Sequence, residues 1–191
     1  MSLILAISGP AAVGKTTICD RLIEEFAPRL NRLVTATTRS PRPQEVNGVD
    51  YIFLTESEFE QKLSDASFLE HEIIHRNKYG ILKQSLLNAQ LEGIDILLNI
   101  DVNGTASLRR FCNNKQELNG RLKTIFIKPL TLEDLRQRMH HRASESDEQM
   151  SIRLANAKAE ILREGEFDFV VESMDRDTDY QKIKEIYLNV R

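Results

Sequence analysis

Short, almost continuously apolar runs alternate along this chain with longer stretches in which apolar residues recur every three or four positions. The apolar runs have the length and composition of strands buried on both faces, and they cover residues 3–7, 94–100, 122–127 and 167–171. The stretches with helical spacing cover residues 15–27, 84–91, 131–141, 152–163 and 180–190. Buried strands that alternate with helices predict an α/β fold, with a parallel sheet covered by helices on both faces.

Two parts of the chain depart from this alternation. Two prolines exclude a long helix from residues 35–43, and residues 55–58, Thr-Glu-Ser-Glu, have the form of a capping box that opens a short helix. Residues 68–75 then predict a strand, followed by a turn at residues 77–78. Residues 142–150 are polar and lack periodicity, so we expect this segment to be mobile.

Composition narrows the class of protein. A chain of 191 residues with 41% hydrophobic and 29% charged residues is typical of one soluble globular domain. The formal net charge of −3 argues against a general nucleic-acid binder, so affinity for phosphate must come from locally placed Arg and Lys. Cys19 and Cys112 suggest neither a zinc site nor a disulfide framework. We find neither a signal peptide nor a membrane span of ~18 apolar residues, and we therefore expect a cytoplasmic protein.

One motif carries chemistry by itself. Residues 9–16 read GPAAVGKT and match the phosphate-loop pattern Gly-x-x-x-x-Gly-Lys-Ser/Thr, between an apolar strand and a helix as that pattern requires. Gly9 and Gly14 let backbone N–H groups point at phosphate oxygens, Lys15 brings a mobile positive charge, and the Thr16 hydroxyl can ligate Mg²⁺. The alternative is a chance Gly-Lys-Thr turn, which the flanking strand and helix disfavour. We therefore predict a site for a nucleoside triphosphate, which the loop alone does not identify as ATP or GTP, at residues Gly9, Pro10, Ala11, Ala12, Val13, Gly14, Lys15, Thr16 and Thr17.

Further motifs indicate the second substrate. Residues 37–51 read TTRSPRPQEVNGVDY, residues 68–70 read FLE, residues 79–80 read YG and residues 99–104 read NIDVNG. Together with the phosphate loop, this series closely resembles guanylate kinase, the enzyme that moves a phosphoryl group from ATP to GMP. The resemblance extends over nearly the whole chain.

The resemblance implies a fold and a division of the chain. It implies the P-loop kinase fold in one domain, with a core of about residues 1–32, 88–129 and 156–191. A small mixed β subdomain that binds GMP would be inserted at about residues 33–87, and a helical lid would lie at about residues 130–155. It further implies Mg²⁺ as the metal that accompanies ATP, activity on dGMP as well as GMP, a role in purine nucleotide metabolism, and a monomer or a homodimer.

The residues that match the GMP site also make chemical sense. Arg39 and Arg42 offer two planar forks to one dianionic phosphate, to which phenolic O–H groups can also donate. Glu70 presents two acceptor oxygens to the N–H groups of guanine, and adenine lacks that donor pair. The alternative for each residue, taken singly, is an ordinary surface or strand residue, or a helix cap in the case of Asp101. The residues that the resemblance assigns to GMP are Thr35, Arg39, Arg42, Tyr51, Glu70, Tyr79 and Asp101.

The resemblance also assigns three lid arginines to the triphosphate. These are Arg138, Arg142 and Arg153, which would neutralise the charge of the triphosphate as the lid closes. Lys15 and Arg39 complete the set of catalytic residues that the resemblance implies. Phosphoryl transfer needs positioning and positive charge more than covalent chemistry. A base is not needed, because the attacking oxygen of GMP is already an anion.

Four positions depart from the family's pattern. Ile81 stands where a small hydroxyl residue helps to hold guanine, and Asn99 replaces the first of two aspartates. Ala143 follows Arg142 where Gly is usual, and Ser173 stands where Asn often contacts adenine. Two other functions therefore stay open: a non-catalytic binding module related to the enzyme, and a kinase for another phosphorylated small molecule. The intact phosphate loop argues against the first, and Glu70 argues against the second.

Overall fold

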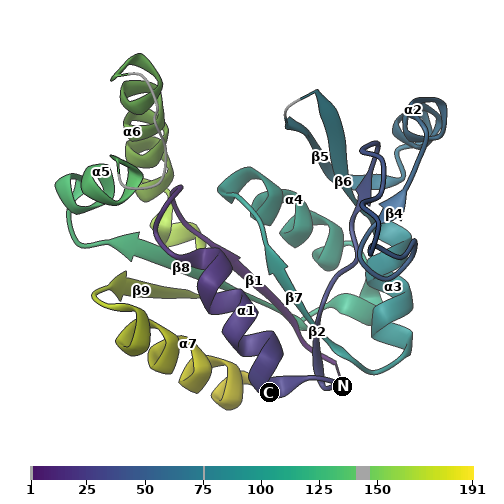
Figure 1. Cartoon of the computed structure of the whole chain (residues 1–191). Helices are drawn as coiled ribbons and strands as arrows, with labels where there is room; N and C mark the ends of the chain where they lie inside the picture. The colour runs from purple at the N-terminus through teal and green to yellow at the C-terminus, as the bar shows by residue number, and fades with distance from the viewer. Residues whose placement is uncertain (1, 75, 141–146) are drawn as a thin grey trace.

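The computed structural model describes residues 2–74, 76–140 and 147–191, and within these residues the strands form two sheets (Figure 1). The first is a parallel sheet with the strand order β2-β7-β1-β8-β9. The second is a mixed sheet with the order β4-β3-β6-β5, in which β3 runs parallel to β4 and antiparallel to β6. The predicted α/β fold with a parallel sheet and a smaller mixed sheet is thus confirmed.

The elements have the following bounds. The strands are β1 Ile4–Ser8, β2 Leu30–Arg32, β3 Ala36–Thr37, β4 Ile52–Phe53, β5 Phe68–Ile74, β6 Asn77–Leu82, β7 Asp95–Asn99, β8 Leu122–Pro129 and β9 Phe169–Ser173. The α-helices are α1 Lys15–Phe26, α2 Glu56–Ser64, α3 Lys83–Leu91, α4 Val102–Asn113, α5 Leu132–His140, α6 Asp147–Ile161 and α7 Arg176–Val190. Two 3-10 turns lie at η1 Gln116–Leu118 and η2 Glu164–Glu166. None of the described helices is long and apolar enough to cross a membrane.

The central strand β1 shows why the sheet is covered on both faces. Its side chains alternate between two apolar clusters, because successive residues of a strand point to opposite faces. Leu5 and Ile7 pack in the cluster that includes α1 and α7, whereas Ile4 and Ala6 pack in the cluster that includes α3 and α4. All residues of β1 are buried. Burial on both faces of the sheet therefore explains why residues 3–7 are apolar without interruption.

The chain ends meet at one buried carboxylate. Asp95 at the start of β7 is 2% exposed and accepts hydrogen bonds from the backbone N–H of Leu3 and the Tyr187 hydroxyl, both at 2.8 Å. The Arg191 side chain donates to the same carboxylate at 2.7 Å. These contacts tie the end of α7 to the start of β7 and to Leu3. They bring the termini together (Figure 1), at the opposite end of β1 from the phosphate loop.

The mixed sheet carries α2, which begins at the predicted capping box. The Thr55 hydroxyl accepts from the N–H of Glu58, and the Glu58 carboxylate accepts from the N–H of Thr55. Phe59 of α2 is fully buried and stacks on Phe68 of β5, with ring centroids 4.3 Å apart. The mixed sheet thus has an apolar core of its own.

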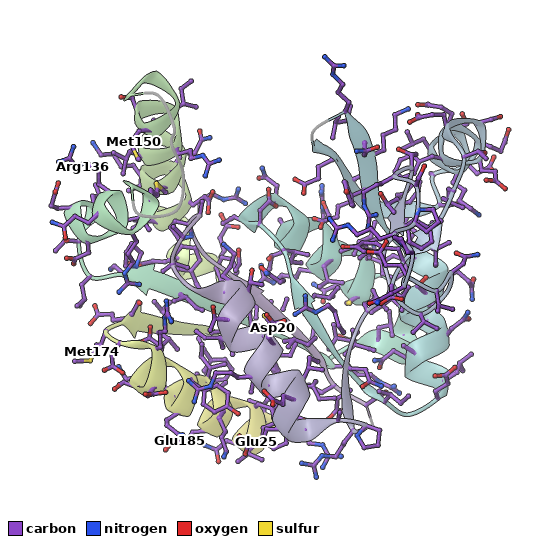
Figure 2. The ribbon with its side chains drawn as sticks, viewed as in Figure 1. Asp20, Glu25, Arg136, Met150, Met174 and Glu185 are labelled. Carbon is purple, nitrogen blue, oxygen red and sulfur yellow. The ribbon has the colours of Figure 1, made fainter. Side chains whose placement is uncertain are left out.

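The structure adds detail to two local predictions. The turn expected at residues 77–78 is wrong, because Asn77 and Lys78 pair with β5 as the first residues of β6; the chain turns just before them, where Arg76 adopts a left-handed φ of 71°. Of the segment expected to be mobile, residues 147–150 begin the helix α6, while residues 142–146 lie outside the described residues. Met150 is buried against α5 (Figure 2), and this packing explains why a polar segment becomes helical.

Candidate active site

The phosphate loop connects β1 to α1 in a conformation that its glycines permit. Gly9 and Gly14 have φ values of 138° and 111°, in a region that other residues rarely adopt. A Cβ atom on Gly9 would stand 2.4 Å from the carbonyl oxygen of Ile127, so no side chain fits there. The first turn of α1 has no side-chain cap and no acidic residue. Its backbone N–H groups therefore face the loop with a positive partial charge.

Lys15 lies across this loop. Its ammonium donates to the carbonyl oxygens of Gly9 at 2.5 Å and Pro10 at 3.0 Å. The long side chain thereby holds its charge at the mouth of the loop, where the outer phosphates of a bound triphosphate would lie.

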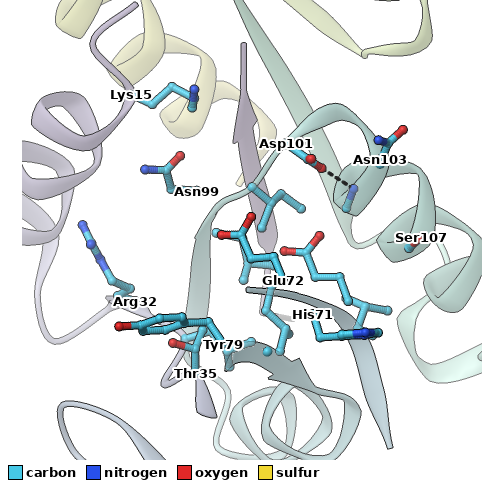
Figure 3. Close-up of a pocket in the computed structure, with 18 of the residues that line it drawn as sticks. Lys15, Arg32, Thr35, His71, Glu72, Tyr79, Asn99, Asp101, Asn103 and Ser107 are labelled. Atoms are coloured by element: carbon cyan, nitrogen blue, oxygen red, sulfur yellow. Dashed lines mark hydrogen bonds between the residues drawn. The ribbon is translucent and has the colours of Figure 1, made fainter. Parts of the chain in front are cut away.

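A cavity of about 1140 Å³ opens between the phosphate loop and the mixed sheet (Figure 3). Lys15 and Asn99 lie at its parallel-sheet side, whereas Thr35 and Tyr79 lie at its opposite end. Both ends belong to one continuous space, which is large enough for two small ligands. The carboxyl ends of parallel strands are also where ligands of such sheets bind.

Glu70 provides a half-buried carboxylate in the wall of this cavity. Its pKa is raised to about 7, mainly by burial and also by the nearby carboxylates of Asp101 and Glu72. A hydrogen-bond acceptor that is partly shielded from water is stabilised most by a ligand that donates N–H groups to it. Glu70 therefore has the environment of a recognition residue.

Asp101 follows β7 and caps α4. Its carboxylate accepts from the N–H of Gly104 at 2.6 Å, the hydrogen bond drawn in Figure 3. The capping alternative considered for this residue is thus correct. Because Asp101 also lines the cavity, capping does not exclude a contact with a ligand.

The arginine pair takes a position that the sequence did not indicate. Arg39 forms a two-pronged ion pair with Glu45, at 2.8 and 3.0 Å, and lies 5.4 Å from the Tyr51 ring centre. The ion pair raises the pKa of Arg39 and lowers that of Glu45. Neither Arg39 nor Arg42 is among the described residues that line the cavity, although Tyr51 does line it.

The two tyrosines expected at the GMP phosphate do lie together. Tyr51 and Tyr79 both line the cavity, and their rings meet edge to face with centroids 6.2 Å apart. Thr35 lines the same end of the cavity. The structure thus brings together Thr35, Tyr51, Glu70 and Tyr79 in the cavity wall, and Arg39 lies over the Tyr51 ring.

The lid arginines are only partly described. The Arg138 guanidinium of α5 donates to Ser173 Oγ at 3.1 Å, to the carbonyl of Met174 at 3.3 Å and to the carbonyl of Val13 at 3.5 Å. Ser173 in turn donates to Asp179 at 2.7 Å. Arg138 therefore links the hairpin of α5 and α6 to the phosphate loop.

The other two predicted lid arginines are described less fully. Arg153 is exposed on α6, and Arg142 lies outside the described residues. Their assignment to the triphosphate stays a prediction.

Glu160 is among the cavity residues that sequence reasoning missed. Glu160 of α6 lines the cavity, and its Oε2 atom is buried without a hydrogen-bond partner in the described part of the chain. Burial raises its pKa, an effect that the charge of Lys15 opposes. In the sequence Glu160 is one polar position on a helix among many, so no motif could have marked it.

Ile81 occupies a packed position. It is 4% exposed and belongs to the apolar cluster that includes Leu33, Leu86 and Leu98, although it also lines the cavity. The side chain at this position thus contributes to the core of the molecule.

Comparison with known proteins decides among the functions left open. The family model described as guanylate kinase matches residues 1–189. The chain belongs to the guanylate kinase family. It is 36% identical over 189 residues to the guanylate kinase of Rickettsia bellii, with 99% of this chain and 95% of the relative covered. It is 38% identical over 168 residues to that of Chlorobaculum tepidum, with 88% and 83% covered.

A solved structure of a family member agrees. The crystal structure of guanylate kinase from Anaplasma phagocytophilum superposes with a TM-score of 0.67 at 26% identity, covering 98% of this chain and 85% of that one. The chain is thus a guanylate kinase-family enzyme with the P-loop kinase fold, and its activity is the phosphorylation of GMP to GDP. Its substrates are ATP and GMP.

Proposed function

We propose that ATP binds with its triphosphate in residues 9–17 and that GMP binds at the mixed-sheet end of the same cavity. The observation that carries this assignment is the continuity of the cavity, which extends from Lys15 to Glu70 and Tyr79. Two reactants held in one space react as if at very high concentration. A separate site for each substrate would not provide this.

Guanine recognition rests on Glu70 and Thr35. The ionised Glu70 carboxylate would accept from the ring N–H and the exocyclic amine of guanine, and the Thr35 hydroxyl would donate to the carbonyl oxygen. AMP would leave Glu70 unpaired, at a cost of about 1–3 kcal/mol or more. Because these contacts involve only the base, we expect dGMP to be a substrate too.

The GMP phosphate is assigned to Tyr51, Tyr79, Arg39 and Arg42. The tyrosines already face the cavity, whereas Arg39 is paired with Glu45. A dianionic phosphate would compete with the Glu45 carboxylate for the same fork of N–H groups. We therefore infer that GMP draws Arg39 towards the cavity.

The transfer itself needs positive charge. Lys15 and Arg138 lie at the phosphate loop, and Arg142 and Arg153 are assigned to the same role as the lid closes. An oxygen of the GMP phosphate attacks the outer phosphorus of ATP without the help of a base, because it is already anionic.

Mg²⁺ fits the donors present. Thr16 is the second residue of α1, next to Lys15, and the carboxylates of Asp101 and Glu160 line the cavity that Lys15 also lines. In the described part of the chain no three His, Cys, Asp or Glu residues form a metal cage, which suits an ion that keeps several waters and is shared with substrate phosphates. When bound, Mg²⁺ would neutralise phosphate charge.

Closure of the two parts that flank the cavity completes the proposal. The mixed sheet and the α5–α6 hairpin rise on opposite sides of the parallel sheet (Figure 1), and we propose that both move over the substrates to exclude water. We assign residues 33–87 to the GMP-binding subdomain and residues 130–155 to the lid. A monomer or a homodimer in cytoplasmic purine metabolism is the setting that we propose.

A substrate panel tests these assignments. ADP release should be rapid with GMP and dGMP and far slower with AMP, CMP or UMP at matched concentrations. Glu70→Gln keeps the size of the side chain but replaces one acceptor oxygen by a donor, so it should raise KM for GMP and leave KM for ATP within about twofold. Equal rates with AMP and GMP in the unmodified enzyme would overturn the guanine assignment.

A further inference from the structure

Gly104 of α4 and the carboxyl group of Glu70 occupy adjacent space. A Cβ atom on Gly104 would stand 1.5 Å from Oε2 of Glu70, 2.5 Å from its Cδ and 3.1 Å from its Oε1. These separations lie below the ~3.5 Å of ordinary non-bonded contact. The carboxyl group therefore lies in the space that any other residue at position 104 would fill.

The backbone gives no separate reason for a glycine at this position. Gly104 is buried in the first turn of α4 and does not have the positive φ of Gly9 or Gly14. Alanine is the better helix former there. The three atoms nearest to the missing Cβ all belong to Glu70, so only this carboxyl group is known to need the space.

The contact also joins the two parts of the molecule that hold the substrates. Gly104 belongs to a helix that packs on the parallel sheet, whereas Glu70 belongs to β5 at the edge of the mixed sheet. Both residues line the cavity. A change at position 104 would thus act on the position of Glu70 from a neighbouring element of the cavity wall.

We propose that Gly104 is a positioning residue for guanine selectivity: its missing side chain sets where the Glu70 carboxylate rests. The inference rests on the proposed role of Glu70 as the guanine acceptor. A carboxylate that receives two N–H groups needs both oxygens at hydrogen-bond distance. A methyl group at position 104 would displace it by more than 1 Å, which is enough to spoil such a geometry.

The first test compares two alanine variants. Gly104→Ala should raise KM for GMP about tenfold or more and reduce the preference for GMP over AMP, with KM for ATP within about twofold. Because the displaced group is the end of a flexible side chain, the melting temperature should change by no more than about 4 °C. Gly165→Ala is the matched control, since a Cβ on that exposed glycine meets no atom within 4 Å, and it should leave all these values unchanged.

The second test asks whether the effect passes through Glu70. Asp is one methylene shorter than Glu, so Glu70→Asp withdraws the carboxylate from position 104. As a single change, Glu70→Asp should raise KM for GMP above that of the unmodified enzyme. The double variant Gly104→Ala/Glu70→Asp should instead have a KM for GMP at least about threefold lower than that of Gly104→Ala. A merely structural glycine would show no such recovery.

Results that differ from these expectations distinguish an error about Gly104 from an error about the guanine assignment. If Gly104→Ala keeps KM for GMP within twofold while Glu70→Gln raises it, the inference on Gly104 is wrong and the guanine assignment stands. If Glu70→Gln also leaves KM unchanged, the guanine assignment fails and the inference fails with it. Loss of folding in Gly104→Ala, or an equal loss in both Glu70 backgrounds, would show that the glycine serves the fold.

Discussion

The side-chain amide of Asn99 donates a hydrogen bond to the hydroxyl of Thr16 at 3.3 Å. Asn99 ends β7 and Thr16 lies in the first turn of α1, so the bond joins the parallel sheet to the phosphate loop. The N–H group of Asn99 occupies a lone pair of the Thr16 hydroxyl oxygen, which is the atom that we assign to Mg²⁺. An amide also contributes no negative charge to a site for a divalent cation.

We therefore expect Asn99→Asp to lower the Mg²⁺ concentration that gives half-maximal rate. The carboxylate would accept from the Thr16 hydroxyl, leave its lone pair for the metal and add a favourable charge. The measurement is a Mg²⁺ titration at fixed ATP. Asn103→Asp is the matched control, because Asn103 also lines the cavity but accepts from Arg163 at 2.7 Å. An equal shift in both variants would show a general charge effect.

Lys15→Ala should lower the turnover rate by more than tenfold, a loss of at least about 1.4 kcal/mol in transition-state stabilisation. The reason is that Lys15 serves the transferring phosphate, while its ammonium donates to the loop carbonyls of Gly9 and Pro10 in the free protein. The melting temperature should stay close to that of the unmodified protein. Lys158→Ala removes a lysine exposed on α6 and should have little effect on rate. A Lys15 variant that retains more than a tenth of the rate would contradict this role.

Ile81→Ser should destabilise the fold. The side chain is 4% exposed in an apolar cluster, so its truncation leaves a cavity and should lower the free energy of unfolding by about 1–4 kcal/mol. Chemical denaturation measures this loss. Ile81→Val, which removes only one methylene, should lose about 0.5–1.5 kcal/mol. If the serine variant is as stable as the original, position 81 is not part of the packed core.

Stability should depend on pH through Glu70. Its pKa is about 7 in the folded protein against an ordinary value of 4.5, so between these values the folded state holds a proton that the unfolded chain has released. Stability therefore falls as pH rises from about 4.5 to about 7, because the carboxylate becomes charged in a half-buried place. Glu70→Gln cannot ionise and should lack this decrease. Melting temperatures of both proteins across this range provide the comparison, and parallel curves would assign the effect to other groups.

The resting state of the arginines shows what local pattern could not predict. The sequence placed Arg39 at the GMP phosphate, yet in the structure Glu45 neutralises it. Glu45 belongs to the same short motif, so the pairing is local. Which partner Arg39 prefers nevertheless depends on the surrounding folded loop and on the Tyr51 ring. The pairing with Glu45 is therefore a property of the folded loop.

What the sequence alone determined is the set of features made by neighbouring residues. The buried strand β1, the phosphate loop and the capping box at Thr55 each depend on residues within a few positions, so periodicity and residue type were sufficient. The turn before β6 was misplaced by two residues, because the pairing of Asn77 with β5 overrides the turn preference of its side chain.

What only the tertiary structure decided is which distant residues share one space. The position of the Glu70 carboxylate against Gly104, the entry of Glu160 into the cavity and the burial of Ile81 all depend on how helices and strands pack. The physical reason is that packing joins residues through shape and excluded volume between elements. Hydrophobic periodicity specifies which face of each element is buried. It does not specify which side chains of other elements pack against that face.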